Sequence, residues 1–451
     1  MSGTTGVAEP GLLATLRAGN RIGSLVQPRG GLIGAVQRLP VRPGEAEAEV
    51  VAASLGALSR TLPQVTAGDS PGGAGSDRTV EIAWLKAVVE AAERYACIVH
   101  DENDFTIASA TDLGRAAIDL TGIARCSARE YADPRCPVRP ADPDRPIRWV
   151  RGVSLIDHTD RFVPAAMVHL HFEPTVDERF WLQTSTGVAA HTSLPAALIA
   201  ALCEVVERDA LALAWLGRLP LDRLAGTPRA EQPERTSQLL ARAAGSMVDF
   251  HYFDATTDLG VPTVLSVQTR TGHPYCDVTV SCATALDGNS ALAKVICEAT
   301  SARIALDSAQ HIPAAVEDFT SLTHGAHYYG RGGQRRAFDF LLDRPATEPP
   351  DGWAIRSCLP DLSTASDEHR LAALVAVLRQ HGMDVVAVDL TTEELREAGL
   401  WVVRVVVPQL MPISFVHRAR FLGTPRLTGY VGRTRPGFTE SDANPDPLPF
   451  A

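Results

Sequence analysis

The chain has 451 residues, of which 45% are hydrophobic and 21% charged. This composition is enough for a large buried core and excludes a fibrous or disordered protein. The formal net charge of −11 disfavours nonspecific binding to nucleic acid or to an anionic membrane, because both favour a basic surface. The N-terminus has no basic segment followed by an apolar one, and charges interrupt the longest apolar stretch, so we expect a soluble cytoplasmic protein without a bilayer span.

The first third of the chain contains segments of different amino-acid composition. Residues 1–22 are rich in Gly, Ala and Thr and predict a flexible tail, which precedes one domain over 23–451. The Gly-, Ser- and Pro-rich stretch 68–77 predicts a loop. Apolar residues at helical spacing then predict an amphipathic helix over 79–97, and a proline-dense linker follows at 133–146.

The remainder of the chain mixes strand patterns with long apolar helices. Helical spacing predicts helices over 194–216, 290–306 and 371–381. Strand patterns occur at 163–172, 248–253, 263–270, 276–281, 384–389 and 401–408. No fixed repeat is present, so the sequence predicts a mixed fold of helices and sheets, α/β or α+β in class.

A short charged pattern occurs twice, as Glu90-Ala-Ala-Glu93-Arg94 and as Glu204-Val-Val-Glu207-Arg208. Residues at i, i+3 and i+4 share one helix face, so each copy presents two carboxylates and a guanidinium together. For an isolated copy, the ordinary explanation is a solvated surface ion pair, which contributes roughly 0.3–0.5 kcal/mol. The predicted helix 194–216, however, has almost no other polar residue, so its charges must be paired or bind a ligand.

The predicted helix over 290–306 adds a third acidic and basic pair, Glu298 and Arg303. If the three helices converge, their carboxylates can bind magnesium through oxygen, and their arginines can bind phosphate oxygens in bidentate geometry. The sequence has no GxxxxGK[ST] motif and no GxGxxG motif after a strand. The pattern therefore predicts a nucleotide site that is neither a P-loop nor a dinucleotide fold.

Several further segments carry a family resemblance. They are Thr186-Gly-Val-Ala-Ala, Ala200-Ala-Leu-Cys-Glu-Val-Val-Glu-Arg-Asp-Ala210, Asp389-Leu-Thr-Thr, Val406-Val-Pro-Gln-Leu-Met-Pro412, Leu422-Gly-Thr-Pro-Arg-Leu427 and Asn444-Pro-Asp-Pro-Leu-Pro-Phe-Ala451. In these segments and the charged pairs, the chain resembles the YcaO family from about residue 23 to the last residue. The resemblance implies a YcaO-type fold, in which three Glu- and Arg-bearing helices pack on largely antiparallel sheets.

The resemblance also implies an activity that uses ATP and Mg²⁺. In the azoline-forming branch, a Cys, Ser or Thr side chain of a ribosomal precursor peptide attacks the preceding carbonyl. The resulting oxyanion is phosphorylated, and phosphate leaves to give the ring. Such chemistry needs positioning and charge neutralisation more than a protein nucleophile. Thioamide and macroamidine formation are the variants with other attacking nucleophiles.

The resemblance assigns roles to particular residues. It implies ATP binding by Glu90, Arg94, Glu204, Arg208, Glu298 and Arg303, and metal binding by Glu90, Glu93, Glu204 and Glu207. Lys86, which does not match the family pattern, is a further candidate for contact with the phosphates of ATP. The end of the chain, 444–451, resembles the PxPxP terminus of azoline-forming members. It implies a catalytic role for the Ala451 carboxylate, which Pro445, Pro447 and Pro449 would direct toward the site, because proline presets an extended backbone.

The sequence also departs from the family pattern at five positions. Ala74 stands where a lysine is usual, Lys86 where the pattern has serine, and Thr192 where it has asparagine. Ala196 replaces a ligand glutamate, and Ser301 replaces a glutamine. Losing a magnesium ligand and a phosphate lysine weakens nucleotide binding, because each charge-assisted contact contributes roughly 1.5–3 kcal/mol. A noncatalytic scaffold or regulatory subunit of a peptide-modifying complex therefore stands as the alternative.

The resemblance implies partners as well. It implies a precursor peptide, a separate protein that binds the leader of that peptide, and a homo- or hetero-oligomer. A flavin-dependent azoline dehydrogenase is a further component of such systems.

Overall fold

The computed structural model describes residues 21–27, 29–56, 58, 62, 65, 71–224, 232–343 and 355–450. Of the predicted flexible tail 1–22, only Arg21 and Ile22 fall within these ranges. They begin the 3-10 helix η1 (Arg21–Leu25), in which Ile22 is buried. The tail prediction for 1–20 and the predicted role of Ala451 concern residues outside the described ranges.

The strands that the structure describes form three sheets, and all pairings between named strands are antiparallel. The first sheet contains β1 (Ala35–Leu39), β2 (Glu49–Ser54) and β3 (Gly72–Asp77). The second contains β8 (Asp222–Leu224), β9 (Asp249–Asp254), β10 (Thr263–Thr269) and β11 (Val278–Thr284). The third contains β4 (Thr106–Ala108), β5 (Ile147–Ser154), β6 (Asp160–Pro164), β7 (Val188–His191), β12 (Val386–Asp389) and β13 (Trp401–Val406).

Helices cover and connect these sheets. The longer ones are α2 (Val80–Ile98), α6 (Leu194–Leu216), α7 (Glu234–Ala244), α8 (Gly288–Leu306), α9 (Leu322–Gly330), α11 (Asp367–Gln380) and α13 (Pro425–Thr434). The short ones are α3 (Ala110–Leu113), α4 (Ala128–Ala132), α5 (Ala165–Val168), α10 (Asp339–Leu342) and α12 (Glu393–Glu397). Further 3-10 turns are η3 (Glu102–Asp104), η4 (Gly114–Ala116), η5 (Val176–Glu178), η6 (Val316–Asp318), η7 (Arg335–Phe338) and η8 (Glu440–Asp442). Among the described helices, none combines the length and the apolarity that a bilayer crossing needs.

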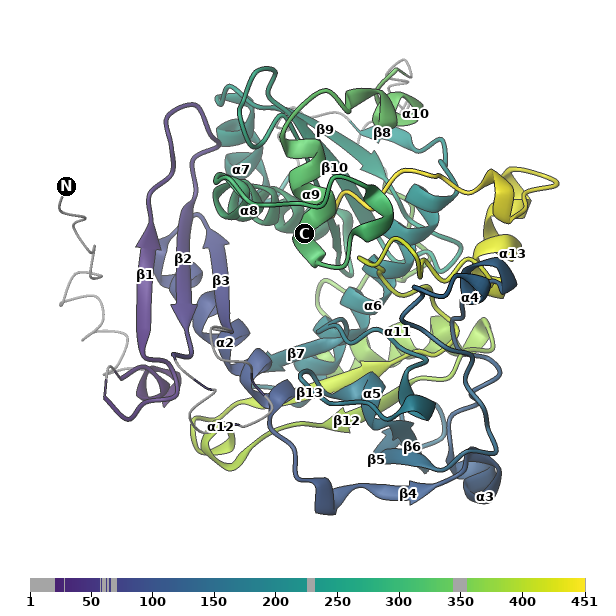
Figure 1. Cartoon of the computed structure of the whole chain (residues 1–451). Coiled ribbons are helices and arrows are strands. Elements are labelled where there is room, and N and C mark those ends of the chain that lie inside the picture. The colour runs from purple at the N-terminus through teal and green to yellow at the C-terminus, as the bar shows by residue number, and fades with distance from the viewer. Residues whose placement is uncertain are drawn as a thin grey trace.

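Each of the three charged helices packs on a different sheet (Figure 1). Helix α2 packs on β2 and β3, and α8 packs on β10 and β11. Helix α6 packs on β7 and β13 and also contacts β11. Helix α2 further touches β7, and α8 touches β3, so the three sheets and three helices meet around one central region.

The sequence predicted these helices well and one edge strand badly. The predicted helix 194–216 coincides with α6, and the predictions 79–97 and 290–306 each fall within two residues of α2 and α8. The predicted loop 68–77 is wrong, because residues 72–77 form β3. Its glycines permit close packing on α2: a Cβ at Gly73 or Gly75 would lie 2.3 Å from the Ala87 carbonyl oxygen or 2.0 Å from the Ala83 one.

The predicted strand 163–172 is also wrong beyond its first two residues. Strand β6 ends at Pro164, and the buried helix α5 follows at once. His171 then adopts a left-handed backbone conformation with a φ of 51°, which ends any strand there. A short, fully buried apolar run has no polar face, so its periodicity cannot separate a strand from a helix turn.

Candidate active site

The acidic and basic residues of α2 face β3 and β7. Glu90 accepts a hydrogen bond from the backbone N–H of Ala74, at 2.8 Å, and another from Arg94, at 2.7 Å. Glu93, one helical turn further, accepts a hydrogen bond from the backbone N–H of Ala190, at 2.7 Å. The i, i+4 pair predicted from the sequence is therefore formed, and Glu93 ties α2 to the third sheet.

The corresponding residues of α6 are Glu204, Glu207 and Arg208, which contact one another. Arg208 donates hydrogen bonds to Glu204 at 3.0 Å and to Glu207 at 2.7 Å. Glu204 also accepts a hydrogen bond from the backbone N–H of Gly187, and Glu207 accepts one from the backbone N–H of Thr284. Because the Glu207 side chain is 2% exposed, its charge depends on these donors.

Helix α8 adds a cation that sequence reasoning missed. The Lys294 ammonium lies 3.0 Å from Glu207 and 3.5 Å from Glu298, so it joins α8 to α6. The signal was present in the sequence, since Lys294 and Glu298 are an i, i+4 pair inside an otherwise apolar stretch. The same argument that singled out Glu204 and Arg208 would have found this pair.

Negative charge is in excess where α2 meets α6. Burial, together with repulsion from Glu90 and Glu204, raises the pKa of Glu93 well above its usual range, although the Ala190 N–H opposes the shift. Burial also raises the pKa of Glu298 to about 7, and Glu207 adds to this while Lys294 opposes it. Carboxylates with such raised pKa values are typical of sites that bind a cation or take part in catalysis.

Two of the predicted site residues are engaged elsewhere. Arg303 is buried and directs its guanidinium to Glu45, with Nε–Oε2 and Nη2–Oε1 distances of 2.5 and 3.0 Å. Lys86 forms an ion pair with Asp77 at 2.8 Å and donates to the Ser76 carbonyl. The structure thus brings together the predicted residues Glu90, Glu93, Arg94, Glu204, Glu207, Arg208 and Glu298, and it places Arg303 and Lys86 in other ion pairs.

A groove opens beside Lys294. It has a cavity volume of about 690 Å³, a size typical of small-molecule sites. Its walls come from one face of α6, the start of α8 and the segment 357–370; the α6 wall includes Ala196 and Cys203. Ala196 therefore leaves open space in the groove where the family pattern has a glutamate.

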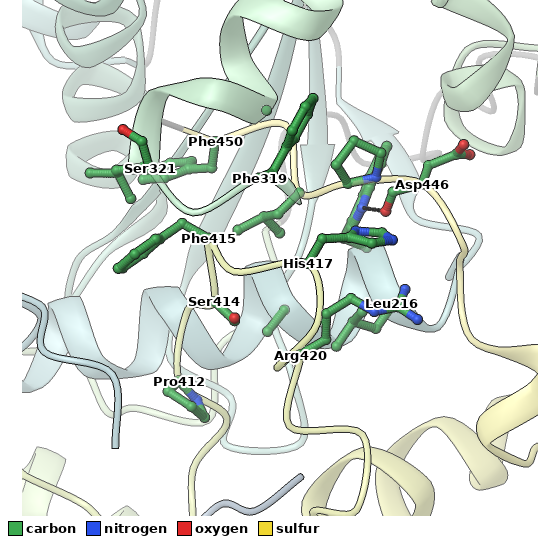
Figure 2. Close-up of a pocket in the computed structure, with 16 residues that line it drawn as sticks. Leu216, Phe319, Ser321, Pro412, Ser414, Phe415, His417, Arg420, Asp446 and Phe450 are labelled. Carbon is green, nitrogen blue, oxygen red and sulfur yellow. Dashed lines mark hydrogen bonds between the residues drawn. The ribbon is translucent and has the colours of Figure 1, made fainter. Parts of the chain in front are cut away.

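The proline-rich end of the chain approaches the same helix from the other side. Pro447 and Pro449 are buried while Pro445 is exposed, and Phe450 lies with its ring 4.4 Å from the guanidinium carbon of Arg208. Figure 2 shows Asp446 and Phe450 on the segment that closes one side of a cavity over α6. Phe450, the last described residue, therefore contacts Arg208 of the group formed by Glu204, Arg208 and Glu207. Ala451 follows Phe450 in the sequence.

The residues present fit a magnesium nucleotide. Among the described residues, no three acidic, His or Cys side chains lie close enough together to hold a metal ion in this conformation. The glutamates of α2 and α6 are nevertheless chemically suitable, because carboxylates are the hard oxygen ligands that Mg²⁺ prefers. A bound cation would also relieve the repulsion around Glu93. The buried Nε of Arg94 has no hydrogen-bond partner within the described structure, which leaves a donor for a phosphate oxygen.

Comparison with known proteins gives a family match and curated relatives. The family model described as "YcaO cyclodehydratase", ATP- and Mg²⁺-binding, matches residues 74–411. An uncharacterized protein of Methanothermobacter thermautotrophicus is 28% identical over 348 residues, which cover 76% of this chain and 82% of the relative. An uncharacterized protein in the tfuA 3′ region of Rhizobium leguminosarum bv. trifolii is 31% identical over 192 residues, or 42% of each chain.

Solved structures share the fold at low sequence identity. A heterocyclase in complex with substrate and cofactor matches with a TM-score of 0.75 and 22% identity over 97% of this chain, and the heterocyclase TruD with 0.59 and 21% over 82%. The present chain spans only 57% and 52% of the lengths of those two chains. YcaO from Methanopyrus kandleri, bound with AMPPCP and Mg²⁺, matches with a TM-score of 0.60 and 19% identity over 89% of this chain and 90% of its own length.

These findings confirm the predicted fold class and the predicted cofactors. The sheets are antiparallel and carry the three charged helices, and the matched family binds ATP and Mg²⁺. Because the family model covers three quarters of the sequence, this chain belongs to the YcaO family.

Proposed function

We propose that the chain is an ATP- and Mg²⁺-dependent cyclodehydratase. It activates a peptide-bond oxygen by phosphorylation, so that a Cys, Ser or Thr side chain of a ribosomal precursor peptide closes to an azoline. One observation supports the proposal most strongly: Arg208 is held between Glu204 and Glu207 and lies against the ring of Phe450, so the charged helix α6 and the proline-rich tail meet at one guanidinium.

The charged residues have distinct tasks in this proposal. Glu90, Glu93, Glu204 and Glu207 would hold Mg²⁺, and Arg94 and Arg208 would bind phosphate oxygens. Bound ATP supplies the phosphoryl group, and its magnesium neutralises phosphate charge. The backbone donors at Ala74, Ala190 and Gly187 fix the carboxylates in place before the ligand arrives, which lowers the cost of ordering them on binding.

The groove beside Lys294 supports the position proposed for the nucleotide. Lys294 lines this groove and pairs with both Glu207 and Glu298, so a ligand there meets a cation that is held by carboxylates of α6 and α8. A nucleotide is of suitable size for the groove. Arg303 and Lys86 lie in other ion pairs in this structure, so we assign the phosphate contacts to Lys294 in their place.

The tail supports azoline formation over the thioamide and macroamidine variants. Its buried prolines bring Phe450 to Arg208, and we propose that the carboxylate of Ala451, the next residue in the sequence, acts beside this arginine. A carboxylate at that place can accept the proton of the attacking side chain. The precursor peptide supplies this nucleophile.

The proposal includes partners. Solved structures that share the fold include the McbBCD microcin synthetase complex of E. coli, one form of which has pro-MccB17 bound. By analogy, the present chain would act on a precursor peptide together with a separate leader-binding protein, in a hetero-oligomer. A flavin-dependent dehydrogenase that oxidises the azoline would be a further component.

A second candidate is a noncatalytic scaffold or regulatory subunit. Two observations favour it: Ala196 places no carboxylate in the groove, and among the described residues the acidic groups do not gather into a metal-binding cluster. Under this alternative, the fold and the partner contacts persist, but magnesium nucleotide does not bind.

Calorimetric titration with Mg·AMPPCP separates the two candidates. The cyclodehydratase proposal predicts micromolar binding by the wild-type protein, and at least tenfold weaker binding by Glu207→Gln, which keeps the size of the side chain but removes its charge. The matched control is Glu397→Gln, because Glu397 is an exposed glutamate of α12. Absence of binding by folded wild-type protein, alone and with its partner, would leave the scaffold function.

A further inference from the structure

The proline-rich end of the chain is held by contacts to its backbone carbonyls. We refer to residues 444–450 as the tail. Arg420 donates to the carbonyl of Asn444 at 2.5 Å, Trp215 donates to that of Asp446 at 3.2 Å, and Tyr329 donates to that of Pro447 at 2.8 Å. Since prolines offer no N–H, a proline-rich segment is best recognised through its carbonyl oxygens.

A steric contact completes this set of interactions. A Cβ atom at Gly325 of α9 would lie 1.9 Å from the carbonyl oxygen of Leu448, so the backbone of α9 approaches the tail as closely as only glycine permits. The ring of Tyr329 also meets that of Trp215 edge to face, with centroids 5.8 Å apart. Helices α6 and α9 therefore hold the tail from two sides, and Figure 2 shows it crossing between them with Phe450 at its far end.

These contacts hold the tail at residues that precede Phe450 in the sequence. The hydroxyl of Tyr329 binds the tail at Pro447, three residues before Phe450, and the Phe450 ring lies 4.4 Å from the guanidinium carbon of Arg208. With its three prolines, the tail is a stiff connection over this distance. Loosening the tail at Pro447 therefore frees the aromatic ring at Arg208.

We propose that Trp215, Gly325 and Tyr329 are positioning residues, which form a clamp that fixes the proline-rich tail so that Phe450 stays on Arg208. The clamp acts on the reaction only through the tail, and it rests on the proposed function for its role in catalysis. Its first consequence is purely structural, because the clamp protects the end of the chain.

Carboxypeptidase digestion of the full-length protein tests the clamp without requiring activity. Release of Phe450, followed by mass spectrometry, should be about fivefold faster in Tyr329→Phe, which loses one buried hydrogen bond. It should be faster still in Gly325→Ala, whose Cβ displaces the tail. Tyr328→Phe, for which the structure describes no hydrogen bond to the tail, and Gly429→Ala, whose Cβ meets no atom within 4 Å, should match the wild type. Equal release rates in all five proteins would overturn the proposal.

A second arm separates failure of the clamp from failure of the proposed function. If Phe450 and the nucleotide contact Arg208 at the same time, saturating Mg·AMPPCP should slow the release of Phe450 from the wild-type protein. This slowing should be smaller in Tyr329→Phe. Nucleotide binding that leaves the release rate unchanged would refute the coupling to Arg208. Absence of nucleotide binding would refute the proposed function, while the rates without nucleotide would still decide whether the clamp exists.

Discussion

Two groups of glutamate and arginine in this molecule, one buried and one half-buried, consist of the same residue types but differ in how their carboxylates are neutralised. In the first, Arg303 and Arg270 surround Glu45, and Arg303 also donates to the Cys276 carbonyl. Burial alone would raise the pKa of Glu45, but the two arginines outweigh it and lower that pKa. In the second group, which contains Glu90, Glu93, Arg94, Glu204 and Arg208, carboxylates outnumber arginines and the pKa of Glu93 is raised.

The difference shows how a structural ion pair can be told from the binding site that we propose. In the Arg303 group, which we call balanced, two arginines satisfy the one carboxylate, Glu45, so this carboxylate needs no further partner. The α2–α6 group contains a repelled carboxylate and a buried arginine Nε without a partner in the described structure, so a bound cation and an anion would both stabilise it. The charged helices alone do not mark the site; the unbalanced charge between them does.

The largest effect is expected from breaking the balanced group. Arg303→Met would leave Glu45 buried with Arg270 as its remaining arginine partner, and this should lower the free energy of unfolding by about 3 kcal/mol. Urea unfolding measures the change. Mg·AMPPCP affinity of the folded variant should equal that of the wild type, because Arg303 does not contact the α2–α6 group. A variant of unchanged stability that fails to bind nucleotide would reverse our assignment of Arg303.

The opposite response is expected at the unbalanced group. Glu93→Gln removes a repelled charge and keeps an oxygen for the Ala190 N–H, so it should raise the free energy of unfolding at pH 7 by about 2 kcal/mol. The same variant should bind Mg·AMPPCP at least tenfold more weakly. Loss of stability would show that Glu93 is a structural residue like Glu45.

A smaller gain is expected from adding a carboxylate to the groove. Ala196→Glu supplies the acidic side chain that the family pattern has at this position, so Mg·AMPPCP affinity should rise about tenfold, or about 1.4 kcal/mol. Ala196→Gln, of the same size but uncharged, serves as the control. Equal affinities in the two variants would show that this position lies away from the metal.

The smallest effect is a pH dependence of the balanced group. The pKa of Glu45 is lower in the folded protein than its usual value of 4.5, so its stabilisation is present above pH 4.5 and is lost as the pH falls through the folded pKa. Between pH 6 and pH 3.5, Glu45→Gln should therefore lose about 1 kcal/mol less stability than the wild type. Equal losses in urea unfolding would contradict the lowered pKa.

Local patterns predicted most of the charged helices and part of the site. The pairs Glu90–Arg94 and Glu204–Arg208 lie one helical turn apart, and both form as predicted. The ion-pair partner of Arg303 is Glu45, which is 258 residues away in the sequence, and no local pattern indicates such a contact. The sequence alone therefore could not show that the third arginine belongs to a separate ion pair.

Tertiary packing explains the remaining differences. The glycines of β3 predict a loop, because glycine is disfavoured in strands, but they are needed where the strand lies against α2. Similarly, the prolines of the tail suggested an extended end, while the residues that hold it, Trp215 and Tyr329, lie far away in sequence. Only the folded chain brings these groups together.

The central claim is that the unbalanced charge between α2, α6 and α8 binds a magnesium nucleotide. Crystals grown with AMPPCP and Mn²⁺, which replaces Mg²⁺ and scatters anomalously, test this claim most directly. The account predicts an anomalous peak ligated by carboxylates among Glu90, Glu93, Glu204 and Glu207, with phosphate oxygens on Arg94, Arg208 or Lys294. A nucleotide bound at another place, or a manganese peak beside Glu45 and Arg303, would contradict it.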